Sequence, residues 1–347
     1  SEAPWNALFR LLSTSPAGVP ALIQMREKLL PLLREHPELA TLDSDLVNVF
    51  RSWFNRGFLE LREIDWHTPA HILEKLIAYE AVHEIKGWDD LRRRLAEDRR
   101  CFAFFHPALV DEPLVFVQVA LTDAMPAKIG NILEQEASEG FVSPKTAVFY
   151  SISNCQQGLR GVSFGNFLIK QVLLELKREF PSIELSVTLS PVPNFRRWVQ
   201  SLLEDDERLA ELGLVGPETE ELRALDSLIQ SDKDKQHREQ IHEQLEKLES
   251  VLMLLCVFFL AREKRMGLPR DAVARFHLSN GARLEQVNWA GDLSYRRLRQ
   301  SFGILVNYAY NADKLELNHE ALVNDGTIAV SPAVKKLANA KLPKRAA

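Results

Sequence analysis

The sequence predicts an α+β fold, with an all-helical N-terminal domain over residues 1–62 and a mixed α/β domain over residues 63–347. In the first part, apolar residues recur at three- and four-residue spacing, which is typical of amphipathic helices. The second part carries several apolar runs of strand length between helical patterns, which indicates a mixed sheet rather than a helical bundle. A chain of 347 residues has room for one large domain and one small one.

The composition is that of an ordinary folded protein, with 46% hydrophobic and 26% charged residues. The net charge of −5 provides no overall positive field that would attract nucleic acid or an anionic membrane. No apolar run approaches the ~18 residues that a membrane span needs, and the N-terminus has no signal-peptide pattern. We therefore expect a cytoplasmic protein that binds neither nucleic acid nor membrane.

Three cysteines, Cys101, Cys155 and Cys256, are far apart in the sequence and form no CxxC pair. This arrangement fits neither a zinc site nor a disulfide framework, and it suits a reducing compartment. The histidines show no HxH or HExxH spacing either. We expect free, buried cysteines and no bound metal.

Two helices are expected in the N-terminal domain, over residues 19–34 and 46–59, and Asp43 or Ser44 is a candidate N-cap for the second. Short helices bury their apolar stripes against each other or against another subunit. The sequence thus predicts that this domain serves packing or self-association. We expect a homo-oligomer, and the pattern leaves dimer and tetramer open.

In the α/β domain the pattern predicts two short helices, then three strands, a helix and a fourth strand. Helical patterns dominate residues 200–265, and the apolar run at 251–261 indicates a helix buried in the core. Strand or turn signals follow around residues 274–278 and 281–289, and a helical tail follows Ser331. The predicted helices are 71–81, 88–96 and 167–180, and the predicted strands are 100–105, 113–121, 147–153 and 183–189.

A loop with three glycines, Gly158, Gly161 and Gly165, lies between a predicted strand and the helix that follows it. Glycines let backbone N–H groups approach a ligand, and a helix N-terminus favours an anion. The pattern indicates a phosphate or pyrophosphate site, or a turn in which the glycines serve only the backbone. It is neither a GxGxxG fingerprint nor a Walker loop. It resembles the acyl-CoA-binding turn of the GNAT acyltransferases, with Ser163 in place of the middle glycine.

Two polar side chains stand where a catalytic group would be useful. Ser190 follows the strand at 183–189 and precedes two prolines that stop a central strand, although a serine before proline is also a common turn residue. His277 lies between two apolar residues, so it could exchange a proton near neutral pH in a partly desolvated setting. A lone histidine in such a pattern is also often a core residue. Spacing alone leaves these alternatives open.

Four stretches together resemble the malonyl-CoA decarboxylase family: FYSISNCQQGLRGVSFGNFLIKQVLLELKREFP, TLSPVPNF, FHLSNGARLEQVNW and SWFNRGFLELREIDWHTP. The resemblance extends from about residue 45 to about residue 315. It implies a small helical domain ahead of a GNAT-like catalytic domain with splayed central strands. It further implies decarboxylation of malonyl-CoA to acetyl-CoA and CO2 without a cofactor, by the catalytic pair Ser190 and His277. The CoA-binding residues that it implies are Arg160, Gly161, Val162, Ser163, Phe164, Gly165 and Asn166.

The implied substrate contains its own electron sink, because loss of CO2 leaves negative charge on the thioester oxygen. We expect His277 to protonate the nascent carbanion, and Ser190 either to orient the malonyl carboxylate or to act as the partner of His277. Two other functions are compatible with the same patterns: a GNAT-type acyltransferase that passes an acyl group to an amine, and a CoA-binding module without turnover. Candidates to hold the CoA phosphates, each with a surface charge as the alternative, are Arg160, Lys170, Arg196 and Arg197.

Overall fold

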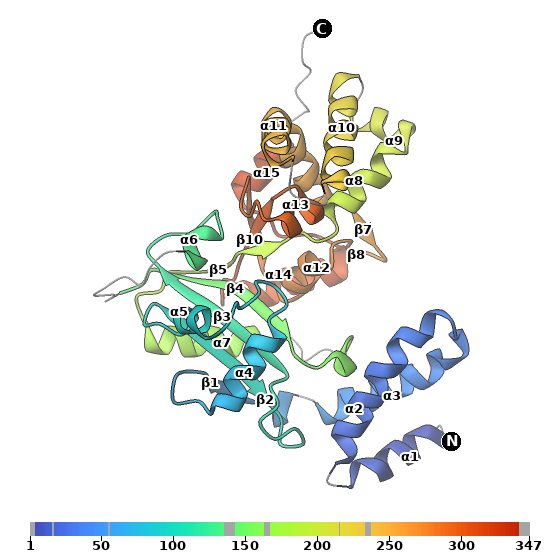
Figure 1. Cartoon of the computed structure of the whole chain (residues 1–347), viewed down its shortest axis with the longest axis vertical. Helices are drawn as coiled ribbons and strands as arrows, with labels where there is room; N and C mark the ends of the chain where they lie inside the picture. The colour runs from blue at the N-terminus through green and yellow to red at the C-terminus, as the bar shows by residue number, and fades with distance from the viewer. Residues whose placement is uncertain are drawn as a thin grey trace. The chain divides into compact units, whose positions relative to one another are not determined.

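The computed structural model describes residues 4–15, 17–54, 56–134, 143–162, 167–214, 216–232 and 237–339. The chain forms two compact units. The first consists of residues 1–122 and 136–183, and the second of residues 123–135 and 184–347. Both contain helices and strands (Figure 1). The predicted α+β fold class, with a helical start followed by mixed helices and strands, is confirmed.

The first unit begins with helices α1 (Pro4–Ser13), α2 (Gly18–Leu29) and α3 (Ala40–Trp53). Short 3-10 turns follow α2 at Leu30–Arg34 and Pro37–Leu39, and another follows α3 at Arg56–Phe58. Helix α3 begins before the predicted start at residue 46, so Asp43 lies within the helix. Its carboxylate accepts a hydrogen bond from Arg26 Nε at 2.7 Å. The predicted N-cap at Asp43 or Ser44 is therefore wrong, because Leu39 is the N-cap residue.

Four antiparallel strands follow one another in the order β1 (Glu60–Glu63), β2 (Arg99–Phe105), β3 (Val115–Thr122) and β4 (Thr146–Asn154). The three predicted strands in this part of the chain are confirmed as β2, β3 and β4. Strand β1 falls where the sequence suggested helix. It has one apolar residue, Leu61, and charged side chains are typical of such an edge strand.

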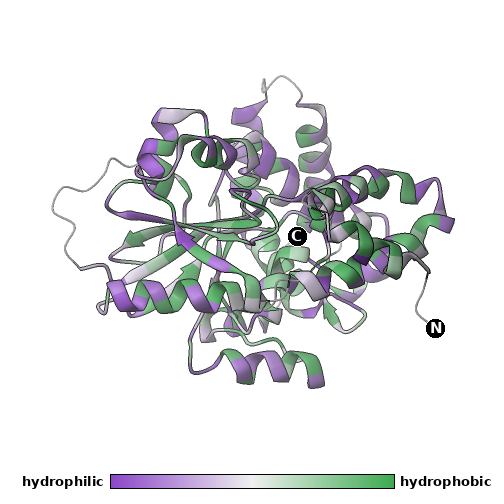
Figure 2. Cartoon of the chain, turned by 90° about the horizontal axis from the view of Figure 1, so that it is seen from below, coloured by the Kyte–Doolittle hydropathy of each residue, from purple (hydrophilic) through white to green (hydrophobic). Residues whose placement is uncertain are grey.

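Alternate side chains of β2 face two different apolar layers, as the two-residue period of a strand requires. Phe102 and Phe104 pack in one cluster, together with residues of α7 (Phe167–Glu179). Cys101, Ala103 and Phe105 pack in the other, with residues of α4 (Ala70–Tyr79) and α5 (Trp88–Arg94). Figure 2 shows the result: strands rich in apolar residues, and helices with polar residues on one side.

The N-terminal helices share a core with the sheet. Phe9 of α1, Ile23 of α2 and Phe50 of α3 belong to the same apolar cluster as Val117 of β3 and Val172 of α7. The apolar sides of these helices are thus buried against the sheet layer as well as against one another. The domain boundary at residue 62 stays a prediction.

The second unit is built around strand β10 (Leu305–Ala309), which pairs antiparallel with β5 (Leu185–Thr188), β6 (Ser190–Pro191) and β9 (Arg283–Asn288). A two-residue hairpin pairs β7 (Lys264–Arg265) with β8 (Leu268–Pro269). The buried helix expected at 251–261 is part of α11, in which Leu252, Cys256 and Phe259 are fully buried. The helices of this unit are α6 (Gly130–Leu133), α8 (Phe195–Leu203), α9 (Asp206–Glu211), α10 (Pro217–Ser231), α11 (Arg238–Arg262), α12 (Ala272–Ser279), α13 (Tyr295–Ser301), α14 (Leu315–Asp325) and α15 (Pro332–Ala338).

Residues 274–278, for which strand or turn was expected, lie in helix α12. Asp271 begins this helix, because its carboxylate accepts hydrogen bonds from the backbone N–H groups of Val273 and Ala274. The apolar pattern of ARFHL is too short to separate a strand from a helix. The cap at Asp271 decides in favour of the helix.

The three cysteines are free and buried, as expected. Burial raises the pKa of each thiol above its ordinary value, so all three stay protonated and unreactive. Among the helices that the structure describes, none combines the length and the apolar character needed to cross a membrane.

Candidate active site

Ser190 lies where strand β5 has ended and the short strand β6 begins. β5 pairs with β10 at Val187 and Ala309, and β6 pairs with β10 at Ser190 and Val306. Proline at position 191 has no N–H group to extend a central strand. Ser190 is 6% exposed, so its hydroxyl lies in an almost closed environment.

The fold brings Ser190 into contact with His277, which is 87 positions away in the sequence. The Ser190 Oγ and His277 Nε2 atoms are 3.1 Å apart. The other ring nitrogen, Nδ1, lies 2.7 Å from the Tyr310 hydroxyl. Strand β6 and the residue after strand β10 thus hold the imidazole from two sides. The two residues that the sequence singled out form a hydrogen-bonded pair.

The hydrogen-bond chain continues beyond Ser190 to Thr188. Ser190 Oγ donates to Thr188 Oγ1 at 2.9 Å, and the backbone N–H of Tyr308 donates to the same Thr188 oxygen at 3.1 Å. Because the serine proton points to Thr188, the Ser190 oxygen accepts from His277 Nε2–H. The arrangement therefore assigns the ring proton to Nε2, with Nδ1 as the acceptor of the Tyr310 hydroxyl.

Burial determines the charge state of His277 and Tyr310 in this hydrogen-bond chain. It lowers the pKa of His277 from 6.5 to about 3, and it raises the pKa of Tyr310 well above its ordinary value. The ring of Tyr308 stacks on the imidazole at 4.7 Å and excludes water from that face. His277 is therefore neutral at physiological pH, so a proton that it exchanges there has to come from the neutral ring.

Amide side chains hold the strand end that carries Thr188. Asn307 Nδ2 donates to the Thr188 carbonyl at 2.8 Å and to the Pro126 carbonyl at 3.3 Å. Asn288 Nδ2 in turn donates to Asn307 Oδ1 at 2.6 Å. These buried side chains replace ladder hydrogen bonds where β5 ends, and they fix the direction in which Thr188 and Ser190 point.

Asp271 connects the two segments that carry the pair. Its Oδ1 atom caps α12, the helix of His277, and its Oδ2 atom accepts from the backbone N–H of Asn194 at 3.4 Å. Asn194 closely follows Ser190 in the chain. Burial raises the pKa of the Asp271 carboxyl, and the surrounding N–H groups compensate the buried oxygens.

The predicted CoA-binding stretch lies in the first unit, and the structure describes Arg160, Gly161 and Val162 of it. Ser163, Phe164, Gly165 and Asn166 lie outside the described residues. Gly161 has φ +81°, a left-handed conformation that favours glycine. The Arg160 side chain is exposed and Val162 is buried. The start of the stretch is thus a tight turn with one cation at its surface.

Of the other phosphate candidates, Arg196 is excluded. It is 4% exposed, and its Nε atom forms an ion pair with Asp226 at 2.7 Å. A buried, paired guanidinium is structural, so the prediction for Arg196 is wrong. Lys170 on α7 is half-buried and Arg197 on α8 is exposed, so both stay candidates.

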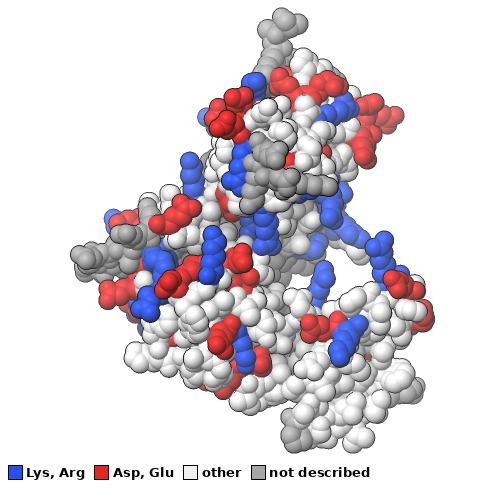
Figure 3. Space-filling model, viewed as in Figure 1, with Lys and Arg blue, Asp and Glu red and all other residues white. Residues whose placement is uncertain are grey.

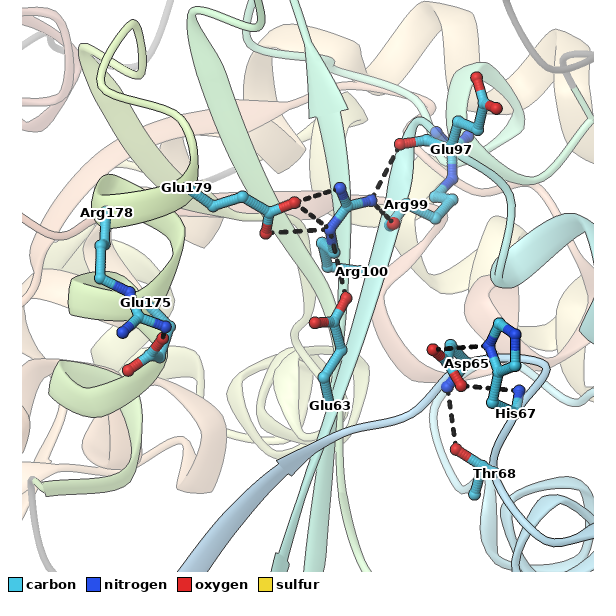
Figure 4. Close-up of polar contacts among 10 residues, drawn as sticks. All are labelled: Glu63, Asp65, His67, Thr68, Glu97, Arg99, Arg100, Glu175, Arg178 and Glu179. Atoms are coloured by element: carbon cyan, nitrogen blue, oxygen red, sulfur yellow. Dashed lines mark hydrogen bonds and ion pairs between the residues drawn. The ribbon is translucent and has the colours of Figure 1, made fainter.

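A cavity of about 330 Å³ in the first unit is lined by Glu63, Arg99, Arg100 and Phe180, among others. Figure 4 shows the Arg100 side chain of this cavity in contact with the side chains of Glu63 and Glu179. Arg100 Nε donates to Glu179 at 3.0 Å and lies 3.4 Å from Glu63, while Arg99 pairs with its neighbour Asp98 at 2.8 Å. Arg100 is paired with two carboxylates, and Arg99 shares Asp98 with Arg93, so both guanidinium groups are already engaged within the protein.

Three or more potential metal ligands do not come together anywhere in the described part of the chain.

The free energy of unfolding should depend on pH through His277. The unfolded chain binds a proton there below about pH 6.5, whereas the folded ring stays neutral down to about pH 3. Acidification through this window should therefore cost about 1.4 kcal/mol of stability per pH unit. Urea unfolding at a series of pH values should show a steeper loss for the wild type than for His277→Gln, which cannot titrate.

The matched control is His71→Gln, which removes a surface histidine from helix α4. The free energy of unfolding of this variant should depend on pH as steeply as that of the wild type. Parallel stability curves for the wild type and His277→Gln would show that burial does not suppress protonation of His277.

Both parts of the chain match family models. Residues 1–54 match the model of the malonyl-CoA decarboxylase N-terminal domain, and residues 57–347 match that of the malonyl-CoA decarboxylase C-terminal domain. The chain belongs to the malonyl-CoA decarboxylase family. The expectation of an enzyme from this family is thereby confirmed.

Members of the family resemble the chain over nearly its whole length. The mitochondrial malonyl-CoA decarboxylase of Anser anser anser is 37% identical over 346 residues, which cover 95% of this chain and 68% of that protein. The crystal structure of the Agrobacterium vitis malonyl-CoA decarboxylase has a TM-score of 0.85 and 48% identity, and the match covers 96% of this chain and 80% of that one. The crystal structure of the Rhodopseudomonas palustris malonyl-CoA decarboxylase has a TM-score of 0.83 and 47% identity. That match covers 95% of this chain and 79% of the other.

Thr188 was not singled out from the sequence, and for Tyr310 the sequence is compatible with core packing and with a role in the site. Thr188 stands two positions before Ser190, so both side chains lie on the same side of an extended segment; that spacing was a usable signal. Tyr310 was visible in the sequence, but nothing local separates a tyrosine of the core from one that binds His277. Only the return of strand β10 past helix α12 brings it to Nδ1.

Proposed function

We propose that the protein converts malonyl-CoA to acetyl-CoA and CO2, with His277 as the proton donor and Ser190 as its partner, and without a cofactor. The observation that carries this proposal is the buried chain of Tyr310, His277, Ser190 and Thr188 in a member of this family. This hydrogen-bond chain presents a neutral N–H donor in a buried environment. The test is an equal yield of CO2 and acetyl-CoA from malonyl-CoA and the purified protein.

The reaction breaks the bond between the malonyl carboxylate and the methylene carbon. The electron pair of that bond passes to the thioester enolate while CO2 leaves. A proton then has to reach the methylene carbon, which forms the methyl group of acetyl-CoA. The protein must therefore supply one proton at a defined atom and keep water from competing for that position.

His277 is suited to this step in its neutral form. The Nε2–H group is the donor, and the Tyr310 hydroxyl can pass its proton to Nδ1 as Nε2 releases its own. The ring then stays neutral throughout, and the negative charge of the enolate passes to the Tyr310 oxygen, which becomes a phenolate as the methyl group forms. Burial raises the pKa of Tyr310, so this phenolate readily takes a proton back. Solvent restores the proton of Tyr310 between turnovers. The relay thus moves a proton without charging the imidazole.

Ser190 can serve the reaction in two ways. In the first, its oxygen holds His277 Nε2–H in the direction of the substrate, as it does in the structure. In the second, its hydroxyl turns from Thr188 to the malonyl carboxylate and binds it until CO2 departs. The two roles differ in what they predict for substrate affinity.

The proposal assigns the CoA part of the substrate to residues 160–166. The left-handed turn at Gly161 supports this assignment. Helix α7 begins directly after this stretch, and a helix N-terminus favours an anion such as the CoA pyrophosphate. Arg160 provides a cation at the start of the stretch.

The cytoplasmic location of the protein stays a prediction.

We also propose that the protein is a homo-oligomer, with helix α1 in the interface between copies. Four apolar residues of α1 are exposed: Trp5 is 48%, Leu8 41%, Leu11 69% and Leu12 43% exposed. They fall on one side of the helix, next to the buried Phe9, whose ring stacks on that of Trp5 at 6.4 Å. Figure 3 shows few charged side chains on this part of the surface. A second copy of the same chain would remove this stripe from water.

Leu8→Glu combined with Leu11→Glu should therefore dissociate the oligomer, because two carboxylates would have to be buried in the interface. Sedimentation velocity measures the mass of the particle directly. The control is Leu174→Glu, which introduces a charge at another exposed leucine, on α7. A wild-type monomer, or a double variant that keeps the mass of the wild-type oligomer, would contradict this assignment of α1.

A further inference from the structure

We propose that Arg26 is a positioning residue through which the N-terminal helices hold in place the first residue of the CoA stretch and the turn before it. Arg26 lies on helix α2, and the backbone in question is the 3-10 turn Gln157–Leu159 with the adjoining residue Arg160. The inference rests on the proposed binding of CoA by residues 160–166. It gives the helical region a task in substrate affinity besides self-association.

The Arg26 guanidinium is buried and joins three segments of the first unit. The residue is 3% exposed. Its Nη1 atom donates to the carbonyl oxygens of Gly158 and Arg160, each at 2.7 Å. Its Nε atom donates to Asp43 of α3 at 2.7 Å, which balances the buried charge. One side chain thus links α2, α3 and the turn before the CoA stretch.

A second, independent contact presses α2 against the same turn. A Cβ atom placed on Gly158 would lie 2.0 Å from the carbonyl oxygen of Ile23, which is a backbone atom of α2. Position 158 therefore has no room for any side chain, and the turn lies directly on the helix. The contact and the two hydrogen bonds from Arg26 together fix the turn on both sides of Leu159.

The position of this turn matters because backbone N–H groups bind phosphates only when several point at the ligand together. Gly161, which adopts its left-handed conformation directly after the two anchored carbonyls, sets the direction of the chain into the stretch. A turn that is held in place before the ligand arrives loses less conformational entropy on binding. Loss of the anchor should therefore weaken binding of CoA and leave the chemical step unchanged.

The test uses Arg26→Gln in the full-length protein, with the dissociation constant of CoA measured by calorimetry and KM and kcat measured with malonyl-CoA. We expect the dissociation constant and KM to rise about tenfold and kcat to stay within about twofold of the wild type. Lys28→Gln is the matched control, because it removes one positive charge from the exposed side of the same helix. It should bind CoA like the wild type.

Asp43→Asn separates positioning from loss of stability. It removes the ion pair with Arg26 but leaves both hydrogen bonds from Arg26 to the turn, so it should lower the free energy of unfolding with a smaller effect on CoA binding than Arg26→Gln. Circular dichroism at the assay temperature ensures that all variants are folded. Equal weakening of CoA binding in both variants, or wild-type affinity in Arg26→Gln, would overturn the inference.

Direct measurement of CoA binding keeps this test distinct from the test of the reaction. A protein that binds CoA but releases no CO2 would defeat the proposed decarboxylation, while a tenfold loss of CoA affinity in Arg26→Gln would still support the role of Arg26. A wild-type protein that does not bind CoA would overturn the inference itself.

Discussion

His277→Ala should lower kcat for malonyl-CoA by about 10²–10⁴-fold, the usual contribution of a positioned general acid. The reason is that the variant lacks the N–H group that is proposed to protonate the enolate. CoA binding should change little, because His277 belongs to α12 and the residues assigned to CoA precede α7. Single-turnover measurement of acetyl-CoA formation follows the chemical step directly, and calorimetry with CoA follows binding.

Tyr310→Phe tests the same proton transfer with a smaller expected effect on the rate. It keeps the ring but removes the hydroxyl that lies 2.7 Å from His277 Nδ1. We expect a loss of rate smaller than that of His277→Ala, since Nε2–H is still present. The control is His71→Gln, a surface substitution that should leave the rate unchanged. Near-wild-type turnover in His277→Ala would show that His277 is not the proton donor.

Ser190→Ala should also lower the rate of decarboxylation by about 10²–10⁴-fold. The variant removes the oxygen that accepts from His277 Nε2–H at 3.1 Å and interrupts the chain to Thr188. Steady-state kinetics with malonyl-CoA measure the effect. The control is Ser201→Ala, because that serine lies on α8 and its hydroxyl donates to the Trp198 carbonyl within the same helix. Full activity in Ser190→Ala would contradict its assignment.

The same variant distinguishes the two roles of Ser190 through inhibition by acetyl-CoA, which lacks the malonyl carboxylate. If Ser190 binds the carboxylate, Ser190→Ala should weaken binding of malonyl-CoA and leave the inhibition constant of acetyl-CoA unchanged. If Ser190 only orients His277, both affinities should be retained and kcat alone should fall. The ratio of the two affinities therefore decides between the roles.

Much of the fold was predictable because local patterns governed it. The strands β2, β3 and β4 and the helix α7 came from apolar runs and helical periodicity, and tertiary packing agreed with those patterns. Where a long-range contact governed the outcome, the pattern failed. Asp43 is of a residue type that is favoured at the N-cap of a helix, but its carboxylate compensates the buried charge of Arg26 instead. A single sequence does not show which residue faces a carboxylate from another helix.

In the candidate site, too, the sequence indicated some features, while others depend on contacts between distant segments. Ser190 and His277 were found from a strand end before prolines and from the resemblance to a family. The lowered pKa of His277 could not be found in that way, because it arises from side chains on α12 and β10 that close around the ring. The helix at 272–279 was misjudged because its cap, Asp271, lies just outside the apolar pattern.

The most direct test of the proposed function is incubation of the purified protein with carboxyl-labelled malonyl-CoA, with no cofactor or metal added. Labelled CO2 and acetyl-CoA are measured together over the course of the reaction. We expect the two products to appear in equal amounts, and neither to appear with His277→Ala on the same time scale. Binding of malonyl-CoA without release of labelled CO2, or transfer of an acyl group to an added amine in its place, would contradict it.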